Sequence, residues 1–286
     1  MASNAEPLSI IIPALNEADN LRGLLPELRA YFPDAEVLVV DDASGDDTHE
    51  VCCEYDVRVE SHLYTLGNGA AVKTGARHAR GRVLVFMDAD GQHQPADIGK
   101  LLSALDEGFD MAIGARDRTS QASAGRGIAN RVFNSLASYL VGHPVLDLTS
   151  GFRAVDAEKF REYLFLLPNG FSYPSTITMA FFRAGYGIKY VPIHAPKRGG
   201  KSHLRPLKEG ARFLLIIFKI GTLYSPLKLF MPVSVGFLLL AASYAAYTLS
   251  VMGRFTNMSV LLFSVSILVL LIGLVSEQVT ALLYRR

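Results

Sequence analysis

The sequence has no tryptophan, only two cysteines, and no excess of charge of either sign. Its 28 Lys and Arg residues nearly balance 27 Asp and Glu residues, which argues against the basic surface of a nucleic-acid-binding protein. Cys52 and Cys53 are adjacent, which disfavours a mutual disulfide and does not match zinc-ligand spacing. The composition therefore predicts no nucleic-acid partner and fits a reducing compartment.

Charged residues are also missing from two long apolar segments, Leu229–Gly253 and Phe255–Ser276. Each is long enough to cross a bilayer, which takes roughly 20 residues. Buried helices of soluble proteins are the alternative, but helices of that length normally carry polar residues on one face. We therefore expect a membrane region over residues 228–286, with transmembrane helices at about 229–252 and 257–283.

The N-terminal segment Met1–Pro7 is polar and lacks the basic start and apolar stretch of a signal peptide. The loop between the two apolar segments holds only Arg254, whereas Lys and Arg crowd the residues outside them. By the positive-inside rule, we expect the N-terminal domain and both termini to be cytoplasmic. The basic residues outside the spans are Arg198, Lys201, Arg205, Lys208, Arg212, Lys219, Lys228, Arg285 and Arg286.

A basic amphipathic helix is predicted over residues 204–227. On a helix, Arg205, Lys208, Arg212 and Lys219 would fall within an arc of roughly 60°. Such a helix would lie among lipid headgroups, with its basic side toward phosphates. The alternative is an ordinary solvated basic face.

Residues 1–203 show strand-like apolar runs that alternate with helical patterns, which predicts an α/β domain with an open, mostly parallel sheet. Two later helices are expected at Gly125–Val141 and Pro174–Ala184, with a polar turn at Asp147–Arg153 between them. The expected strands are Leu8–Ile12, Val37–Val40, Val57–Glu60, Val83–Met87, Met111–Ile113 and Ile188–Pro192.

Acidic residues follow three of these strands, at Asn16-Glu17, Asp41-Asp42 and Asp88-Ala-Asp90. Ligands of open α/β sheets bind outside the carboxyl ends of the strands, so the three clusters predict one site. Paired carboxylates suit hard cations such as Mg²⁺ or Mn²⁺, which can bridge to a diphosphate. A lone Asp-x-Asp after a strand is equally ordinary turn chemistry.

Six motifs occur in order, at Ser9–Glu17, Val39–Thr48, Gly67–Gly75, Asp88–Pro95, Thr149–Arg153 and Arg198–Ser202. Together they resemble inverting family 2 glycosyltransferases, specifically polyprenyl-phosphate sugar synthases of the dolichol-phosphate mannose synthase type. The two C-terminal apolar segments resemble those of bacterial members that make undecaprenyl-phosphate glucose. The resemblance implies a GT-A type fold. It also implies inverting transfer of a hexose from a UDP- or GDP-linked sugar to undecaprenyl or dolichyl phosphate.

The resemblance also implies roles for individual residues. Asp90 and Asp147 would be catalytic, with Asp147 orienting or deprotonating the acceptor phosphate; simple turn formation is the alternative for Asp147. One departure is Asn68, where relatives commonly carry Lys. For Asp41 and Asp42 the alternative role is helix capping.

The resemblance implies three sets of binding residues. The implied donor-binding residues are Pro13, Ala14, Glu17, Asp41, Asp42, Asn68, Asp88 and Ala89. The implied metal ligands are Asp88, Asp90 and Gln92, and the implied acceptor-phosphate residues are Arg116, Arg131, Ser135, Arg198, Lys201 and Ser202.

Three other functions are weighed against this one. A processive polysaccharide synthase uses a Gln-x-x-Arg-Trp motif, and this chain has no Trp. A transferase acting on another lipid, such as diacylglycerol, stays open, as does a non-catalytic membrane scaffold, although a scaffold has no need of the Asp88–Asp90 pair. The sequence leaves open the sugar, the base, self-association, and the role of Glu277 near the end of the second apolar segment.

Overall fold

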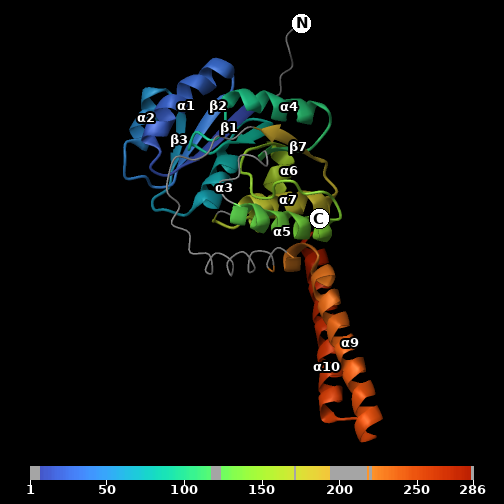
Figure 1. The fold of residues 1–286 in the computed structure, drawn as a ribbon. Coiled ribbons are helices and arrows are strands. Elements are labelled where there is room, and N and C mark those ends of the chain that lie inside the picture. Colours follow the sequence, from blue (N-terminus) through green and yellow to red (C-terminus); the bar gives the residue numbers. More distant parts are fainter. Residues whose placement is uncertain (1–6, 117–123, 171, 194–217, 219–220, 285–286) are drawn as a thin grey trace. The chain divides into compact units, whose positions relative to one another are not determined.

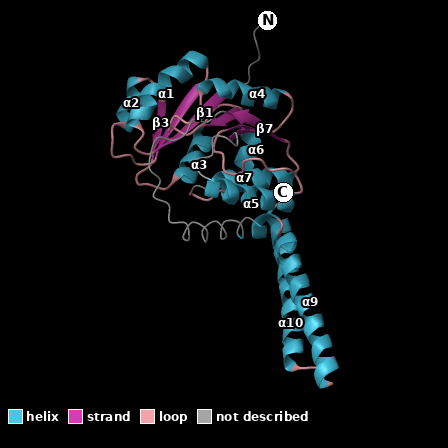
Figure 2. Ribbon diagram, viewed as in Figure 1, coloured by secondary structure: helices cyan, strands magenta, loops and turns pink. Residues whose placement is uncertain are grey.

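The structure is a computed structural model that describes residues 7–116, 124–170, 172–193, 218 and 221–284, with the backbone alone over 124–131. The chain divides into two compact units. Unit 1 comprises Met1–Ser135 and Pro144–Ser202, and unit 2 comprises Leu136–His143 and His203–Arg286. Unit 1 is built of helices around a sheet, and two long helices dominate unit 2 (Figures 1 and 2).

The sheet of unit 1 has seven strands in the order β3-β2-β1-β4-β6-β5-β7. All pairs are parallel except those of β6, which runs antiparallel to both β4 and β5. The predicted α/β class with a mostly parallel sheet is therefore confirmed. The strands are β1 (Leu8–Ala14), β2 (Glu36–Asp41), β3 (Arg58–Ser61), β4 (Val83–Phe86), β5 (Met111–Arg116), β6 (Arg153–Asp156) and β7 (Ile188–Ile193).

Helices cover both faces of this sheet, because successive side chains of a strand point to opposite sides. Ile10 and Ile12 of β1 pack in a core with α1, α2 and α4, whereas Ile11 packs with α3, α6 and α7. A Cβ at Gly75 of α3 would lie 2.3 Å from Ile11 Cγ2, so glycine permits the close approach of α3 to the sheet. The helices are α1 (Ala18–Tyr31), α2 (Thr48–Glu54), α3 (Asn68–His78), η1 (Pro95–Asp97), α4 (Ile98–Asp106), α5 (Ala124–Val141), α6 (Ala157–Glu162), η3 (Leu164–Leu166) and α7 (Tyr173–Ala184).

Strand β6 was not predicted, since the sequence indicated a polar turn through Arg153. The turn is shorter, and Arg153 instead begins a strand in which it pairs with Phe86 of β4 and Ile113 of β5. The four residues of β6, Arg153–Asp156, carry a charged residue at each end and lack the alternation of apolar and polar residues that indicates a strand. Long-range pairing with two neighbours decides the conformation here.

The register brings the predicted acidic clusters to one edge of the sheet. Ala14 at the end of β1 lies opposite Asp41 at the end of β2, and Ile11 lies opposite Phe86 at the end of β4. Asp42 and Asp88 therefore follow neighbouring strands at the same edge, where open α/β sheets bind their ligands.

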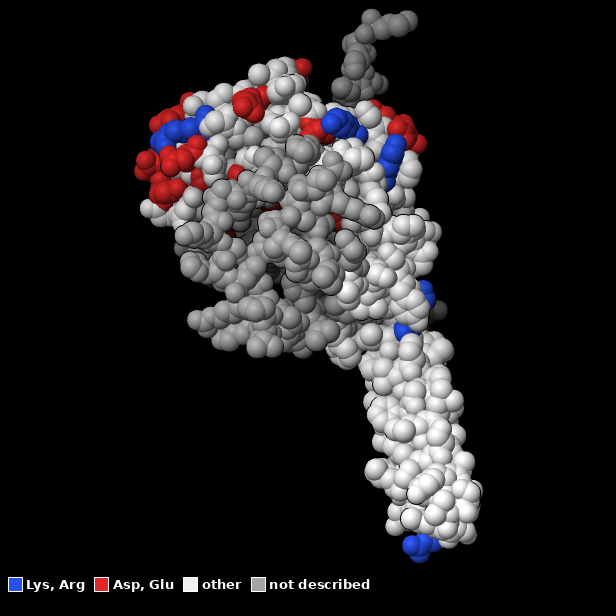
Figure 3. All heavy atoms as spheres, in the orientation of Figure 1, with Lys and Arg blue, Asp and Glu red and all other residues white. Residues whose placement is uncertain are grey.

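Unit 2 contains the two candidate membrane spans, α9 (Pro226–Met252) and α10 (Asn257–Leu283). They pack along a seam of small residues, in which the hydroxyls of Ser234 and Ser266 each donate to the other residue's carbonyl oxygen at 2.9 Å. Most of their large apolar side chains are exposed, and Figure 3 shows a surface without charge along most of the hairpin. Small polar residues between helices and apolar residues outside are typical of helices packed in lipid.

Glu277 of α10 lies beside the start of α9, where its Oε2 accepts a hydrogen bond from the Leu227 amide at 3.3 Å. Free amides at a helix start favour a negative partner. In the same unit, Lys228 Nζ donates to Leu140 O at 2.9 Å, near the end of α5. Glu277 thus accepts from a backbone amide at the start of α9, and Lys228 donates to a backbone carbonyl near the end of α5. Of the predicted helix over 204–227, residues 204–217, 219 and 220, which include Arg205, Lys208, Arg212 and Lys219, lie outside the described part.

Candidate functional site

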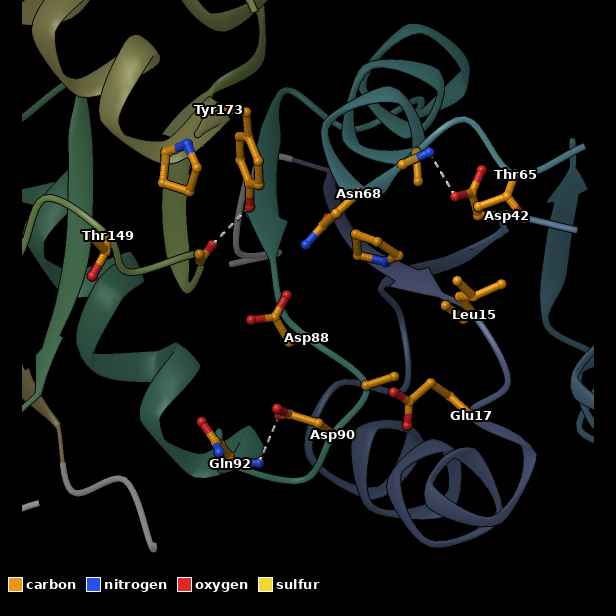
Figure 4. A pocket seen from close by; sticks show the side chains of 17 residues that line it. Leu15, Glu17, Asp42, Thr65, Asn68, Asp88, Asp90, Gln92, Thr149 and Tyr173 are labelled. Atoms are coloured by element: carbon orange, nitrogen blue, oxygen red, sulfur yellow. Dashed lines mark hydrogen bonds between the residues drawn. The ribbon is translucent and has the colours of Figure 1, made fainter. Parts of the chain in front are cut away.

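A cavity of about 520 Å³ opens at the carboxyl edge of the sheet in unit 1. Its volume is that of a typical small-molecule site. Figure 4 shows side chains that converge from the segments after β1 and β4, from the start of α3 and from the start of α7. The lining residues are Pro13, Ala14, Leu15, Glu17, Asp42, Thr65, Gly67, Asn68, Ala71, Asp88, Ala89, Asp90, Gln92, Thr149, Gly151, Tyr173 and Pro174.

The segment after β4 supplies the predicted metal ligands. Asp88, Asp90 and Gln92 all line the cavity, and the backbone amide of Gln92 donates to Asp90 Oδ1 at 3.2 Å. Across the described part of the chain, no cluster of three or more His, Cys, Asp or Glu side chains is placed to hold a metal. Two carboxylates and one amide oxygen nevertheless fit Mg²⁺ or Mn²⁺, because these ions commonly take only one or two carboxylates and complete their shell with substrate phosphates and water. The donor set therefore fits the predicted metal when a phosphate ligand is present.

The two adjacent acids after β2 have different surroundings. Asp42 lines the cavity and accepts from the backbone amides of Leu66 at 2.8 Å and Gly67 at 2.7 Å. Its Oδ1 is also 2.6 Å from His62 Nδ1. Asp41 is not among the lining residues, and its Oδ1 accepts from the Ser44 amide at 2.9 Å. The geometry places Asp42 at the cavity and gives Asp41 a turn-closing contact.

The other predicted donor-binding residues on β1 and α3 also line the cavity. Pro13 and Ala14 end β1, Glu17 is the N-cap of α1, and Ala89 lies between the two acids that follow β4. Asn68 is the first residue of α3, and its buried Oδ1 has no hydrogen-bond partner among the described residues. Figure 4 shows the amide nitrogen of Asn68 directed into the cavity. A helix start of this kind offers backbone amides to an anion.

Arg116 and Asp147, which were predicted for different roles, form one ion pair beside the cavity. Arg116 Nε donates to Asp147 Oδ2 at 2.9 Å, and Arg116 Nη2 donates to Thr149 Oγ1 at 2.9 Å. Burial acts to raise the pKa of Asp147, but hydrogen bonds from Arg116 and Thr149 outweigh it, and the pKa is lowered. Asp147 is therefore ionised at neutral pH and poorly suited to take a proton.

The remaining acceptor residues are less fully described. Ser135 is exposed on α5 and does not line the cavity. The side chain of Arg131, and all of Arg198, Lys201 and Ser202, lie outside the described residues.

Several cavity residues were missing from the prediction. Tyr173 is buried and contributes its ring from the start of α7, with its hydroxyl 3.5 Å from Gly151 O. Thr149 and Gly151 belong to the motif that begins at Thr149, so the sequence could have predicted that they line the cavity. Tyr173 had no such signal, because it belongs to a distant segment that only the fold brings to the cavity.

The buried His93 lies next to the same site, with its ring stacked on Phe152 at a centroid distance of 4.7 Å. Its Nδ1 has no partner among the described residues, and burial lowers its pKa. His93 is therefore neutral near pH 7 and packs as an aromatic ring.

The chain matches Glycosyl transferase family 2 over residues 9–164 and the GtrB C-terminal hairpin over residues 225–282. It is 28% identical over 204 residues to polyprenol monophosphomannose synthase of Mycolicibacterium smegmatis, covering 66% of this chain and 77% of that protein. It is 27% identical over 294 residues to Glycosyltransferase AglJ of Haloferax volcanii, covering 97% of this chain and 95% of that protein.

A solved structure is similar in fold. Glucosyl-3-phosphoglycerate synthase from Mycobacterium tuberculosis, in complex with Mn²⁺, UDP and glucosyl-3-phosphoglycerate, superposes with a TM-score of 0.60. The match covers 76% of this chain and 80% of that chain at 22% identity. The predicted GT-A type fold is thereby confirmed.

Proposed function

The chain belongs to glycosyl transferase family 2, and from that premise we propose that it transfers a hexose from a UDP- or GDP-linked sugar to a polyprenyl phosphate with inversion. The observation that carries the proposal is that Asp88 and Asp90 open into one cavity together with Asp42 and the start of α3. Relatives that act on polyprenol and the C-terminal hairpin support a lipid acceptor.

In the proposed reaction, a lipid phosphate oxygen attacks C1 of the sugar, the bond from C1 to the diphosphate oxygen breaks, and the nucleoside diphosphate leaves with the electron pair. Mg²⁺ or Mn²⁺ held by Asp88, Asp90 and Gln92 would supply positive charge to the diphosphate. Pro13, Ala14, Glu17 and Asp42 would position the nucleoside. No strong base is required, since the second pKa of a phosphate monoester lies near 6.

For the acceptor, we propose that Arg116 contacts the lipid phosphate and Asp147 holds Arg116 in place. The paired geometry supports this division, because both Asp147 oxygens already accept hydrogen bonds from Arg116. Arg131, Ser135, Arg198, Lys201 and Ser202 remain proposed acceptor contacts. Arginine suits two-pronged phosphate binding.

We further propose that unit 1 and both termini are cytoplasmic and that α9 and α10 anchor the enzyme where the acceptor headgroup lies. The excess of Lys and Arg outside the spans, with only Arg254 between them, supports this orientation. A cysteine-labelling experiment tests it: in sealed vesicles, a cysteine introduced at Thr256 should be labelled from the side opposite to the native, exposed Cys53.

The enzymatic proposal is tested with the purified full chain, Mn²⁺ or Mg²⁺, and a panel of UDP- and GDP-hexoses. Separate reactions contain undecaprenyl phosphate, dolichyl phosphate or diacylglycerol, and mass spectrometry identifies the lipid product. The expected product is a hexosyl polyprenyl phosphate, which should be lost with Asp90→Asn and kept with Asp34→Asn at an exposed site outside the cavity. Glycosylated diacylglycerol would replace the proposed acceptor, and donor hydrolysis alone would refute it.

A further inference from the structure

Arg153 is a buried cation that the proposed reaction does not use. Its side chain is completely inaccessible, in the middle of the sheet on β6. Within the described part of the chain, no Asp or Glu lies within ion-pair distance of it, and its Nε has no hydrogen-bond partner. Arginine stays protonated even when burial lowers its pKa, as it does here, so the site holds an unpaired positive charge.

Stability alone does not account for such a charge. Removing a guanidinium from water costs several kcal/mol, and replacing buried ionic groups by apolar ones of similar volume is often neutral or stabilising. Buried charges that lack an ion-pair partner are therefore uncommon unless they act on something nearby.

Apart from a contact between its Nη1 and Met111 Sδ at 3.7 Å, the hydrogen bonds of Arg153 lead to the segments that form the wall of the donor cavity. Its Nη2 donates to Ser150 O, and its Nη1 donates to Pro174 O at 3.3 Å and to Thr178 Oγ1 at 3.2 Å. The guanidinium also lies 5.9 Å from the centre of the Tyr173 ring. Tyr173 and Pro174 line the cavity, so the cation lies directly behind its wall.

This wall is packed against a proposed metal ligand. A Cβ added to Gly151 would lie 3.2 Å from both Asp88 Oδ2 and the Tyr173 hydroxyl. Figure 4 shows Asp88 and Tyr173 facing the same space. Burial lowers the pKa of Arg153, and two carboxylates, Asp147 and then Asp88, act in the opposite direction by their charge.

The cavity itself has the opposite charge. Its described lining contains the carboxylates Glu17, Asp42, Asp88 and Asp90 and no Lys or Arg side chain. A nucleoside diphosphate that enters it meets negative charge on several sides. Charges behind a dry protein wall act more strongly than the same charges in water.

We propose that Arg153 is a positioning residue whose unpaired charge attracts the donor diphosphate through the cavity wall and opposes cation binding at Asp88 and Asp90. The inference rests on the proposed function in taking a nucleoside diphosphate as the ligand. It predicts effects of opposite sign: loss of the charge weakens diphosphate binding and strengthens cation binding. A residue that only supports the fold would weaken both.

The test compares Arg153→Met and Arg153→Lys with the unsubstituted full chain in detergent. Mn²⁺ binding is followed by electron paramagnetic resonance without nucleotide, and binding of UDP, GDP and uridine by calorimetry without metal. For Arg153→Met we expect the Kd of the bound diphosphate to rise by about tenfold and that of Mn²⁺ to fall several-fold. The Kd of uridine, which has no phosphate, should change by less than about twofold.

Arg153→Lys keeps the charge without the two-pronged contact, so its Mn²⁺ affinity should equal that of the unsubstituted protein. A matched control is Arg161→Met, which removes an arginine that donates to the backbone carbonyls of Ala76 and Ala79 outside the cavity. It should leave all affinities unchanged. Thermal unfolding of each variant identifies any that fails to fold.

Equal losses of UDP and uridine affinity in Arg153→Met, or no gain in Mn²⁺ affinity, would overturn the inference. If that variant does not fold, a folded Arg153→Lys with tightened Mn²⁺ binding would overturn it instead. None of these measurements requires sugar transfer, so the two proposals can fail separately. If the variants show the expected binding pattern but the protein transfers no sugar, the inference about Arg153 holds and the proposed transferase activity is refuted. If the unsubstituted protein binds neither UDP nor GDP in the presence of Mn²⁺, the proposed donor site and this inference both fail.

Discussion

Replacing Arg116 by methionine should destabilise unit 1 in a way that depends on pH. The substitution leaves the Asp147 carboxylate buried without the partner that donates to both of its oxygens. Breaking a buried pair costs about 3–5 kcal/mol, but the Arg116 side chain is 35% exposed, so solvent screening reduces this to about 1–2 kcal/mol. For a unit of this size the thermal midpoint should fall by about 3–6 °C at neutral pH.

The sign of the pH dependence follows from the two opposing influences on Asp147. In the unsubstituted protein its pKa is lowered, so its contribution to stability is present above the unfolded pKa of about 3.9 and is lost as pH falls through the folded value. Without Arg116, burial is the largest remaining influence and is opposed by the hydrogen bonds from Thr149, so we expect the folded pKa to rise above the unfolded one. The carboxylate then destabilises the protein at neutral pH, and this penalty is relieved as pH falls.

Circular dichroism melts of both proteins between about pH 7 and pH 4.5 check this prediction. The difference between their midpoints should shrink on acidification, and Arg116→Met combined with Asp147→Asn should recover most of the loss at neutral pH. A midpoint difference that is constant across this range, or a double variant no more stable than Arg116→Met alone, would refute the reasoning. Arg161→Met controls for the general effect of removing a half-buried arginine.

Three further predictions concern other contacts. Asp90→Ala should reduce transfer by about 10³-fold with an unchanged melting midpoint, measured by initial rates; normal turnover would remove Asp90 from the site. Asp42→Ala leaves the amides of Leu66 and Gly67 without their acceptor, so it should lower the free energy of unfolding by about 1–3 kcal/mol and raise the donor KM, and denaturant titration with donor kinetics checks both. Glu277→Leu should lower the midpoint of the full chain in detergent more than Glu277→Gln, which keeps an oxygen acceptor; equal effects would exclude the helix-start contact.

Much of the cavity was predictable from the sequence because strand periodicity and turn chemistry are local. The run that ends in Asp88 and Asp90 indicates both a buried strand and the edge at which it ends, and the structure places both side chains in the cavity. Asp41 and Asp42 mark the limit of such reasoning. They are adjacent and chemically identical, yet only Asp42 lines the cavity, because successive residues at a strand end point to opposite sides.

The pairing of Arg116 with Asp147 and the place of Arg153 required the fold. The first two come from separate segments, and β6 has no strand signal of its own, because its conformation depends on β4 and β5. The sequence predicts that Arg153 ends a polar turn, whereas the structure buries it completely within the sheet. Residues whose role depends on contacts between distant segments are those that the sequence could not assign.

The central claim is that the lipid phosphate itself displaces the nucleoside diphosphate in one step. Nuclear magnetic resonance of the purified lipid product tests this directly, through phosphorus coupling to C1 and H1 of the sugar and through the anomeric coupling constant. A single phosphate that links C1 to the lipid, with an anomeric configuration opposite to that of the donor, is the predicted result. A product with retained configuration, or free hexose with unmodified lipid phosphate, would contradict it.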